Sequence, residues 1–201
     1  MRILAATGNR HKLDEFRSLL SPHGFVVLGS ADVGGLPPVV EDADSFEGNA
    51  AKKAIEIALA TGLPCFSDDS GLEVAALHGS PGIYSARYAG PKATDDDNVQ
   101  LLLRRLHGIQ DRRARFVCVI ACADASGRLI GTARGECPGQ ITLTPQGLAG
   151  FGYDPVFIPE GESKTFAELG ESIKNRLSHR QAALQESLRL DLWQQLRDAT
   201  P

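Results

Sequence analysis

The chain has 201 residues, of which 42% are hydrophobic, and a formal net charge of −4. We expect a single domain of two lobes over residues 1–201 without a separate linker, because a chain of this length can bury a sizeable core but is short for two independent domains. The net negative charge excludes long-range attraction to nucleic acid or to anionic membranes. Charged residues interrupt the first twenty positions, so a signal peptide is not expected there, and no later stretch is apolar enough to span a bilayer. We therefore predict a cytoplasmic protein with neither kind of partner.

Apolar strand-like and helix-like segments alternate along the chain, which predicts an α/β fold with a mixed sheet. A strand at residues 3–6, a loop at 7–10 and a helix at 12–20 open it, and a strand at 25–28 follows. Next comes a helix that begins near Ser45 and has its strongest helical composition at residues 49–60. A short strand before Asp68, a strand at 72–77 and a helix at 95–106 follow. A hairpin of residues 115–123 and 128–132, strands near 140–143 and at 156–158, and a helix from about Ser178 with leucines at 184, 188, 192 and 196 complete the series.

The most informative segment is residues 64–71, where a short apolar strand ends in two adjacent carboxylates, Asp68 and Asp69, followed by Ser70 and Gly71. Mg²⁺ is commonly bound by one or two carboxylates together with phosphate oxygens of a substrate. This pattern favours a magnesium site at a strand end and phosphate chemistry. The alternative is that one carboxylate caps a turn and the other is solvated.

Phosphate chemistry also requires cations and N–H donors, and residues 7–12 combine a hydroxyl, a glycine, an amide and Lys12 where a helix begins. The Walker spacing is absent, so an ordinary strand-to-helix turn is an equal interpretation. The acidic run at residues 95–97 also stands at a helix start, where it is interpreted as capping.

Two later segments suit a planar ligand. Residues 150–155 place aromatic side chains between glycines and a carboxylate, which fits either a stacked ring or a plain turn. Lys174, His179 and Arg180 supply donors close to a helix start. The four cysteines lack metal-ligand spacing, and buried thiols are expected for Cys118 and Cys122.

Read together, these segments form an ordered series of motifs. They are Thr7-Gly8-Asn9-x-x-Lys12, Phe46-Glu47-x-Asn49-Ala50, Asp68-Asp69-Ser70-Gly71-Leu72, Pro81-Gly82-Ile83-Tyr84-Ser85-Ala86-Arg87-Tyr88, Phe151-Gly152-Tyr153-Asp154-Pro155 and Ser178-His179-Arg180. The series resembles the inosine triphosphate pyrophosphatase family, the Mg²⁺-dependent dITP/XTP pyrophosphatases that cleanse the nucleotide pool. The likeness runs from Ile3 to at least Arg180.

The resemblance implies a fold, an activity and an assembly. The fold would be elongated and two-lobed, with a long twisted mixed sheet flanked by helices and an active cleft between the lobes. The activity would be Mg²⁺-dependent hydrolysis of dITP, ITP and XTP to the nucleoside monophosphate and pyrophosphate. The assembly would be a homodimer.

The resemblance also implies roles for individual residues. Asp69 would accept a proton from water, directly or through a metal-bound hydroxide, and would bind the metal with Glu41. Asp42, Asp44 and Glu47 remain alternatives to Glu41, because the family often has Glu where Gly48 stands. The triphosphate would be bound by Thr7, Gly8, Asn9, Arg10, His11, Lys12, Lys53 and Lys174, Ser70 would contact the substrate, and the base would be bound by Phe151, Gly152, Tyr153, Asp154, His179 and Arg180.

Three other functions compete with this interpretation. A Maf-like pyrophosphatase would act on other nucleotides, and a nucleotide-sensing module would bind without turnover. A structural protein would use the leucine-rich C-terminal helix as a dimer seam.

Overall fold

The computed structural model describes residues 1–199, so residues 200–201 of the predicted domain lie outside the described residues. Its six strands form one sheet in the order β2-β1-β3-β4-β5-β6. Strand β1 is parallel to β2 and to β3, and β5 is antiparallel to β6, so the sheet is mixed and the predicted α/β class is confirmed. The strands are β1 (Arg2–Ala5), β2 (Val26–Leu28), β3 (Cys65–Val74), β4 (Arg113–Ala123), β5 (Leu129–Ile141) and β6 (Phe157–Pro159).

Seven α-helices occur among the described residues. They are α1 (Arg10–Leu20), α2 (Phe46–Thr61), α3 (Asp95–Arg105), α4 (Phe166–Leu169), α5 (Glu171–Leu177), α6 (His179–Arg189) and α7 (Leu192–Asp198). Ser45 caps α2 by accepting a hydrogen bond from the Gly48 N–H, which agrees with the predicted helix start. No helix within residues 1–199 is long and apolar enough to cross a lipid bilayer.

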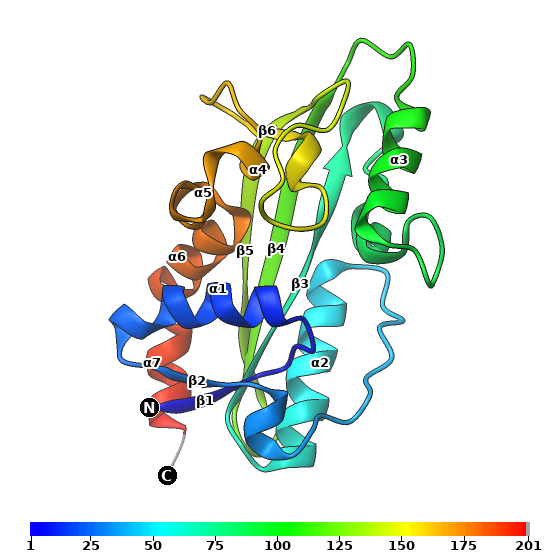
Figure 1. Ribbon diagram of the computed structural model, residues 1–201. Helices are drawn as coiled ribbons and strands as arrows, with labels where there is room; N and C mark the ends of the chain where they lie inside the picture. The colour runs from blue at the N-terminus through cyan, green and yellow to red at the C-terminus, as the bar shows by residue number, and fades with distance from the viewer. Residues whose placement is uncertain (200–201) are drawn as a thin grey trace. The chain divides into compact units, whose positions relative to one another are not determined.

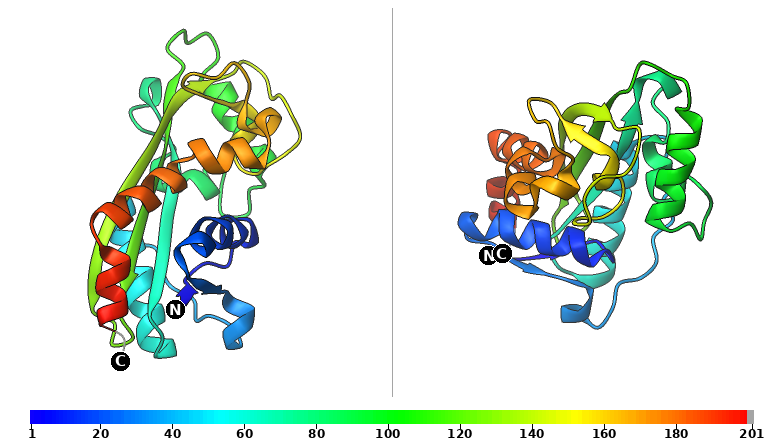
Figure 2. Two further views of the ribbon diagram at one scale, coloured as in Figure 1. Left: turned by 90° about the vertical axis from the view of Figure 1, so that its left-hand side faces the viewer. Right: turned by 45° about the horizontal axis from the view of Figure 1, so that its top comes forward.

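The chain divides into two compact units, and the single-domain expectation stays a prediction. The first unit comprises residues 1–69, residues 118–135 and the C-terminal residues from Ala183 onward. Helix α1 lies alongside β1 and β2 (Figures 1 and 2) and packs on β2. The core of this unit is aromatic at its centre, where Phe66 lies between Phe16 and Trp193 with ring centroids 5.0 and 5.6 Å away. This packing fixes the start of β3 against α1.

The second unit comprises residues 70–117 and 136–182 and has its own core. Phe116 of β4 packs against Phe157 of β6 and Phe166 of α4, with centroid separations of 4.5 and 6.2 Å. Helix α3 lies beside the 3₁₀ turn Gly82–Arg87 (Figure 1). The four cysteines of the chain are buried free thiols, as expected for Cys118 and Cys122.

The prediction that a strand ends at Asp68 is wrong. Strand β3 continues through Asp68, Asp69 and Ser70 to Val74 and lies inside the sheet between β1 and β4. Gly71 does not turn the chain, because it lies within β3 and its φ is not positive. The two carboxylates therefore stand on an interior strand, where cations or hydrogen-bond donors from other elements must compensate their burial.

The expected single C-terminal helix is also wrong, because α6 and α7 are separate. Asp191 takes the left-handed conformation, with φ of 55°, and interrupts the leucine repeat. Leu184, Leu192 and Leu196 are buried in the first unit's own core, so a dimer seam made of these leucines is not supported. The strand expected near residues 140–143 is the end of the long strand β5.

The predicted hairpin is present as β4 and β5, joined by a turn that Asp124 organises. Its Oδ1 atom accepts hydrogen bonds from the Ser126 hydroxyl and from the N–H groups of Ser126 and Arg128, and its Oδ2 atom accepts one from the Arg128 guanidinium. These donors, the Ser126 hydroxyl foremost, hold the pKa of Asp124 at about 2, below its ordinary 3.8.

We predict that Asp124→Ala lowers the free energy of unfolding by about 1–2 kcal/mol at neutral pH, because the turn loses its acceptor. A depressed carboxylate pKa contributes stability above the unfolded value, and that contribution is lost as pH falls from 3.8 towards about 2. Urea titrations at several pH values should therefore show wild type and variant converging near pH 2. A gap that stays constant down to pH 2 would contradict the assignment, and Asp124→Asn, which keeps one acceptor oxygen, should lose less.

Candidate active site

Two carboxylates of β3 meet lysines from two different helices in the first unit. The Asp68 Oδ2 atom lies 2.9 Å from the Lys12 Nζ atom of α1. The Lys53 Nζ atom of α2 lies 3.5 Å from Asp69 Oδ1 and 3.0 Å from Glu41 Oε1. We call these five residues, Lys12, Glu41, Lys53, Asp68 and Asp69, the acidic-lysine cluster.

Burial and charge act in opposite directions on the cluster. Asp69 is only 7% exposed, and this burial raises its pKa, while the ammonium groups of Lys53 and Lys12 partly oppose the rise. Burial alone would lower the pKa of Lys53, but the surrounding carboxylates raise it. Lys53 thus stays cationic, and Asp69 is a more basic carboxylate than an exposed aspartate. A more basic carboxylate suits the acceptance of a proton.

The residues of the cluster fit a divalent cation whose coordination shell is completed by oxygen atoms of a bound ligand. Asp69 Oδ2 is buried without a hydrogen-bond partner, which leaves a carboxylate oxygen for another ligand. Within residues 1–199, no group of three or more His, Cys, Asp or Glu side chains is already placed to hold a metal ion. One or two carboxylates with phosphate oxygens is the donor set that Mg²⁺ prefers, whereas an all-protein cage is absent from this part of the chain.

The loop that carries Glu41 is held by the first turn of α2. The buried Asn49 side chain accepts a hydrogen bond of 3.0 Å from the Ala43 N–H. At Gly48, an added Cβ would stand 2.7 Å from the Ala43 Cβ atom, so the loop can lie this close only because position 48 has no side chain. The departure from the family pattern at Gly48 therefore accompanies a tightly seated loop.

Of the alternatives to Glu41, Asp42 pairs with Lys52 and Glu47 pairs with Arg134, at 2.6 and 3.0 Å. Glu41 instead reaches Lys53, which also contacts Asp69. The geometry thus favours Glu41 as the second carboxylate, and its binding of a metal stays a prediction.

The loop before α1 uses two of its side chains to shape itself. Thr7 Oγ1 accepts a hydrogen bond from the Asn9 N–H, and Asn9 Oδ1 caps the helix by accepting one from the Lys12 N–H. Space beside Gly8 is open, and Arg10 and His11 are exposed. The start of α1 thus presents backbone N–H groups near the Lys12 ammonium, and this combination suits the binding of an anion.

The second unit brings together the other predicted residues. Asp154 and Lys174 form a buried ion pair with 2.6 Å between Oδ2 and Nζ, and the same Oδ2 atom accepts a hydrogen bond from the Phe151 N–H. The Lys174 ammonium also lies 4.2 Å from the centre of the Phe151 ring. Lys174, which the sequence analysis assigned to the triphosphate, therefore lies with the residues assigned to the base.

Arg180 and His179 complete this group. The Arg180 guanidinium lies 5.4 Å from the centre of the Phe151 ring and donates a hydrogen bond of 3.2 Å to Ser70 Oγ. His179 stacks on Phe116 at 4.8 Å, which fixes the start of α6. We call Ser70, Phe151, Asp154, Lys174, His179 and Arg180 the aromatic cluster. Its arrangement, a ring face flanked by two cations, suits a planar polar ligand.

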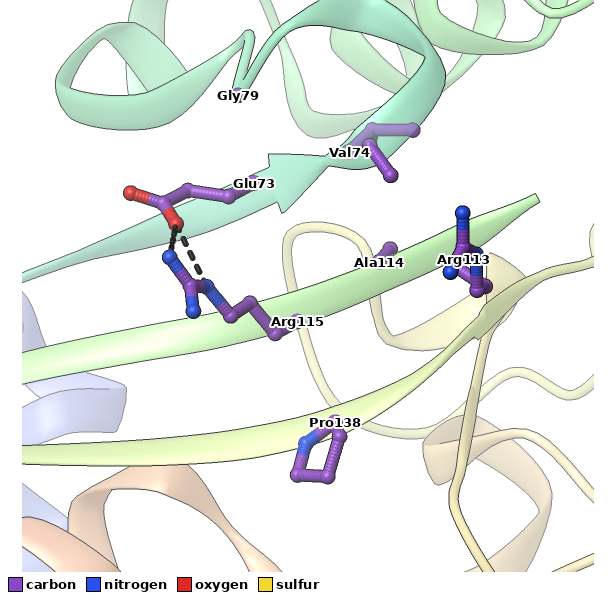
Figure 3. Close-up of a pocket in the computed structure, with 8 residues that line it drawn as sticks. Glu73, Val74, Gly79, Arg113, Ala114, Arg115 and Pro138 are labelled. Carbon is purple, nitrogen blue, oxygen red and sulfur yellow. Dashed lines mark hydrogen bonds and ion pairs between the residues drawn. The ribbon is translucent and has the colours of Figure 1, made fainter. Parts of the chain in front are cut away.

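A surface hollow of about 360 Å³ in the second unit stands apart from these residues. Its charged lining is paired within the protein, since the Arg115 guanidinium contacts Glu73 at 2.7 Å (Figure 3) and Glu136 at 3.0 Å. None of the predicted site residues lines it. The hollow is therefore not included in the candidate site.

Comparison with known proteins decides the family. The model of the Ham1 family matches residues 3–190. The chain belongs to the Ham1 family. The resemblance inferred from the ordered motifs is thereby confirmed.

Relatives within the Ham1 family match most of the chain. A protein of Desulfotalea psychrophila named dITP/XTP pyrophosphatase is 47% identical over 184 residues, which are 92% of this chain and 82% of the relative. Another of that name from Exiguobacterium sp. is 46% identical over 186 residues, 92% of this chain and 94% of the relative. The structure of the Staphylococcus aureus Ham1 protein matches with a TM-score of 0.81 at 38% identity, covering 92% of this chain and 95% of that chain.

Sequence reasoning about this Ham1-family chain overlooked several residues that shape the two clusters. Asn49, which holds the Glu41 loop, was quoted only as part of a motif, although a buried asparagine in a helix signals a specific hydrogen bond. The local pattern at residues 115–123 indicates a strand and gives no sign that Phe116 stacks on His179. Asp95 was interpreted as a capping residue, but its Oδ2 atom accepts a hydrogen bond from the Gly152 N–H. Asp97 does form a capping box with Thr94, as expected of that acidic run.

Proposed function

We propose that the protein hydrolyses the non-standard purine nucleoside triphosphates dITP, ITP and XTP to the monophosphate and pyrophosphate. The observation that carries the proposal is that β3 supplies both clusters with consecutive residues, Asp69 to the acidic-lysine cluster and Ser70 to the aromatic cluster. The acidic-lysine cluster offers the cations and the carboxylates that binding and hydrolysis of a triphosphate require. The aromatic cluster offers the ring and the hydrogen-bond donors that a purine base requires. The relatives named dITP/XTP pyrophosphatase support the same substrate class.

The chain's own residues account for binding and proton transfer. Lys12, Lys53 and the N–H groups at the start of α1 would hold the phosphate oxygens and offset their charge. Water would attack the α-phosphorus, the bond to the oxygen between the α- and β-phosphorus atoms would break, and pyrophosphate would leave with that bond's electron pair. Asp69 would take the proton of the attacking water. Glu41 and Asp69 would hold Mg²⁺, which, when bound, neutralises charge on the triphosphate.

Selectivity follows from the atom at position 6 of the purine. Hypoxanthine and xanthine carry an oxygen there, which accepts a hydrogen bond from a donor such as Arg180, whereas adenine carries an amino group. Adenine would leave a buried donor unpaired, at a cost of about 1–3 kcal/mol. Guanine shares the oxygen, so we infer that the loop at residues 150–154 disfavours its 2-amino group. Phe151 would provide the ring on which the base stacks.

We predict that Arg180→Ala reduces the preference for dITP over dATP at least tenfold, because the donor to the 6-oxo group is lost. The ratio of the two kcat/KM values measures this preference. An unchanged ratio in Arg180→Ala would remove Arg180 from edge recognition. Arg180→Lys, which keeps a donor without the planar fork, should fall between wild type and the alanine variant.

The proposed function is tested by analysing the products formed from a panel of nucleoside triphosphates with Mg²⁺. We expect dIMP and pyrophosphate from dITP, with slow turnover of dATP and dGTP. Preferential hydrolysis of pyrimidine nucleotides would indicate the Maf-like alternative, and saturable dITP binding without product would indicate a sensing module. Orthophosphate with dIDP would place the attack at a different phosphorus. A cytoplasmic homodimer stays a prediction.

A further inference from the structure

The loop that carries Phe151 is fastened to the first turn of α3. Gly152 lies between Phe151 and Tyr153 in a left-handed conformation, with φ of 59°, and its N–H donates a hydrogen bond of 2.7 Å to Asp95 Oδ2. From the other side, the Phe151 N–H donates to Asp154 Oδ2. Two carboxylates thus hold two successive N–H groups of the loop. Asp154, which also pairs with Lys174, holds the N–H of Phe151, and Asp95 of α3 holds the N–H of Gly152.

The same helix holds the segment on which Tyr153 rests. The side chain of Asn98 in α3 accepts a hydrogen bond of 2.8 Å from the Ala89 N–H and donates one of 3.3 Å to the Ala86 carbonyl. The buried Tyr153 hydroxyl donates to the Ser85 carbonyl at 2.9 Å, and the Ser85 hydroxyl accepts a hydrogen bond from the Leu72 N–H of β3. Helix α3 therefore anchors both the loop at residues 150–154 and its support.

We propose that Asp95 is a positioning residue for purine selectivity, acting by fixing the peptide between Phe151 and Tyr153. The inference rests on the proposed function, since it takes Phe151 as the ring on which the base stacks. A glycine backbone has many accessible conformations, and an anchoring hydrogen bond reduces them. Without the Asp95 oxygen, a smaller fraction of molecules would present the Phe151 ring in its binding position, and apparent affinity falls in proportion to that fraction.

The obvious competing role for Asp95 is electrostatic, because any aspartate in a first turn stabilises the helix dipole. Asp96 provides the matched control. It is the next residue of the same turn, is likewise exposed and carries the same charge. Its side chain accepts a hydrogen bond only from Gln100 among the contacts found within residues 1–199. Asp95→Ala and Asp96→Ala thus remove the same charge, but only the first removes the anchor of Gly152.

The test compares Asp95→Ala, Asp95→Asn and Asp96→Ala in hydrolysis of dITP and dATP and in amide hydrogen exchange of the free protein. We expect Asp95→Ala to raise KM for dITP about tenfold with kcat within about twofold, and to lower the dITP preference. Exchange at residues 150–153 should accelerate in this variant. Asp96→Ala should match wild type, and Asp95→Asn, which keeps an acceptor oxygen, should recover most of the loss.

Each outcome bears on one claim. Equal exchange rates in Asp95→Ala and Asp96→Ala would overturn the anchoring. Faster exchange with the same KM and the same selectivity as Asp96→Ala would overturn the positioning role. Failure of the wild-type protein to hydrolyse dITP would overturn the proposed function, while the exchange comparison would still decide whether Asp95 holds the loop.

Discussion

Asp69→Asn is expected to lower the rate of pyrophosphate release from dITP by about 10²–10⁴-fold, the range typical of a lost general base. The amide keeps the shape of the carboxylate but cannot take the proton from water. Initial rates at saturating dITP measure the effect, and dITP binding by the variant should remain detectable because the two lysines are retained.

The same substitution should leave the fold intact. Burial raises the pKa of Asp69, so the stability associated with its protonated form is present in acid and is lost as pH rises through the raised value. At neutral pH the ionised carboxylate is therefore a burden that the amide does not carry, and the free energy of unfolding should not fall. Asp68→Asn is the matched control, since it alters the neighbouring buried carboxylate. A larger rate loss for Asp68→Asn than for Asp69→Asn would reassign the base.

Lys174→Met is expected to lower the free energy of unfolding by about 3–5 kcal/mol at pH 7.5, because it leaves Asp154 buried without its cation. Methionine fills a similar volume, so the loss reflects charge more than packing. Urea unfolding measures the difference. Lys52→Met, the same change in a more exposed ion pair with Asp42, should cost much less, because solvent screens that pair.

Acid should partly rescue Lys174→Met. Burial already raises the pKa of Asp154, and the Lys174 ammonium opposes that rise, so its removal raises the pKa further. A raised pKa favours the folded state at low pH, where the carboxyl is protonated, and this advantage is lost as pH increases. The deficit relative to wild type should thus shrink as the pH is lowered from 7.5. Adding Asp154→Asn should recover part of it at neutral pH, and a variant as stable as wild type at pH 7.5 would contradict the buried-pair assignment.

Local patterns predicted the α/β class and most helices well, because helix caps and turns depend on residues that are close together in the sequence. Ser45 at the start of α2 and the Asp124 turn between β4 and β5 are examples. The ordered motifs identified the family. They worked because several short patterns in a fixed order are far more specific than any one of them.

Features that depend on distant partners were not predictable in this way. Asp68 and Asp69 resembled a strand end because nothing local showed that Lys12 and Lys53 would allow two carboxylates inside a sheet. The pairing of Lys174 with Asp154, twenty residues earlier in the chain, is likewise not indicated by the residues around either of them. In the C-terminal helices the leucine spacing continued across Asp191, so periodicity concealed the break.

The two carboxylates proposed for the metal differ in their mechanical freedom. Asp69 stands on a strand with neighbours on both sides, and moving it would mean separating the central ladders of the sheet. Glu41 stands on a segment without regular secondary structure, tethered near its end by Asn49. On the proposed assignment, Asp69 is thus the rigid ligand and Glu41 the adjustable one, so we expect Glu41 rather than Asp69 to move when a ligand binds.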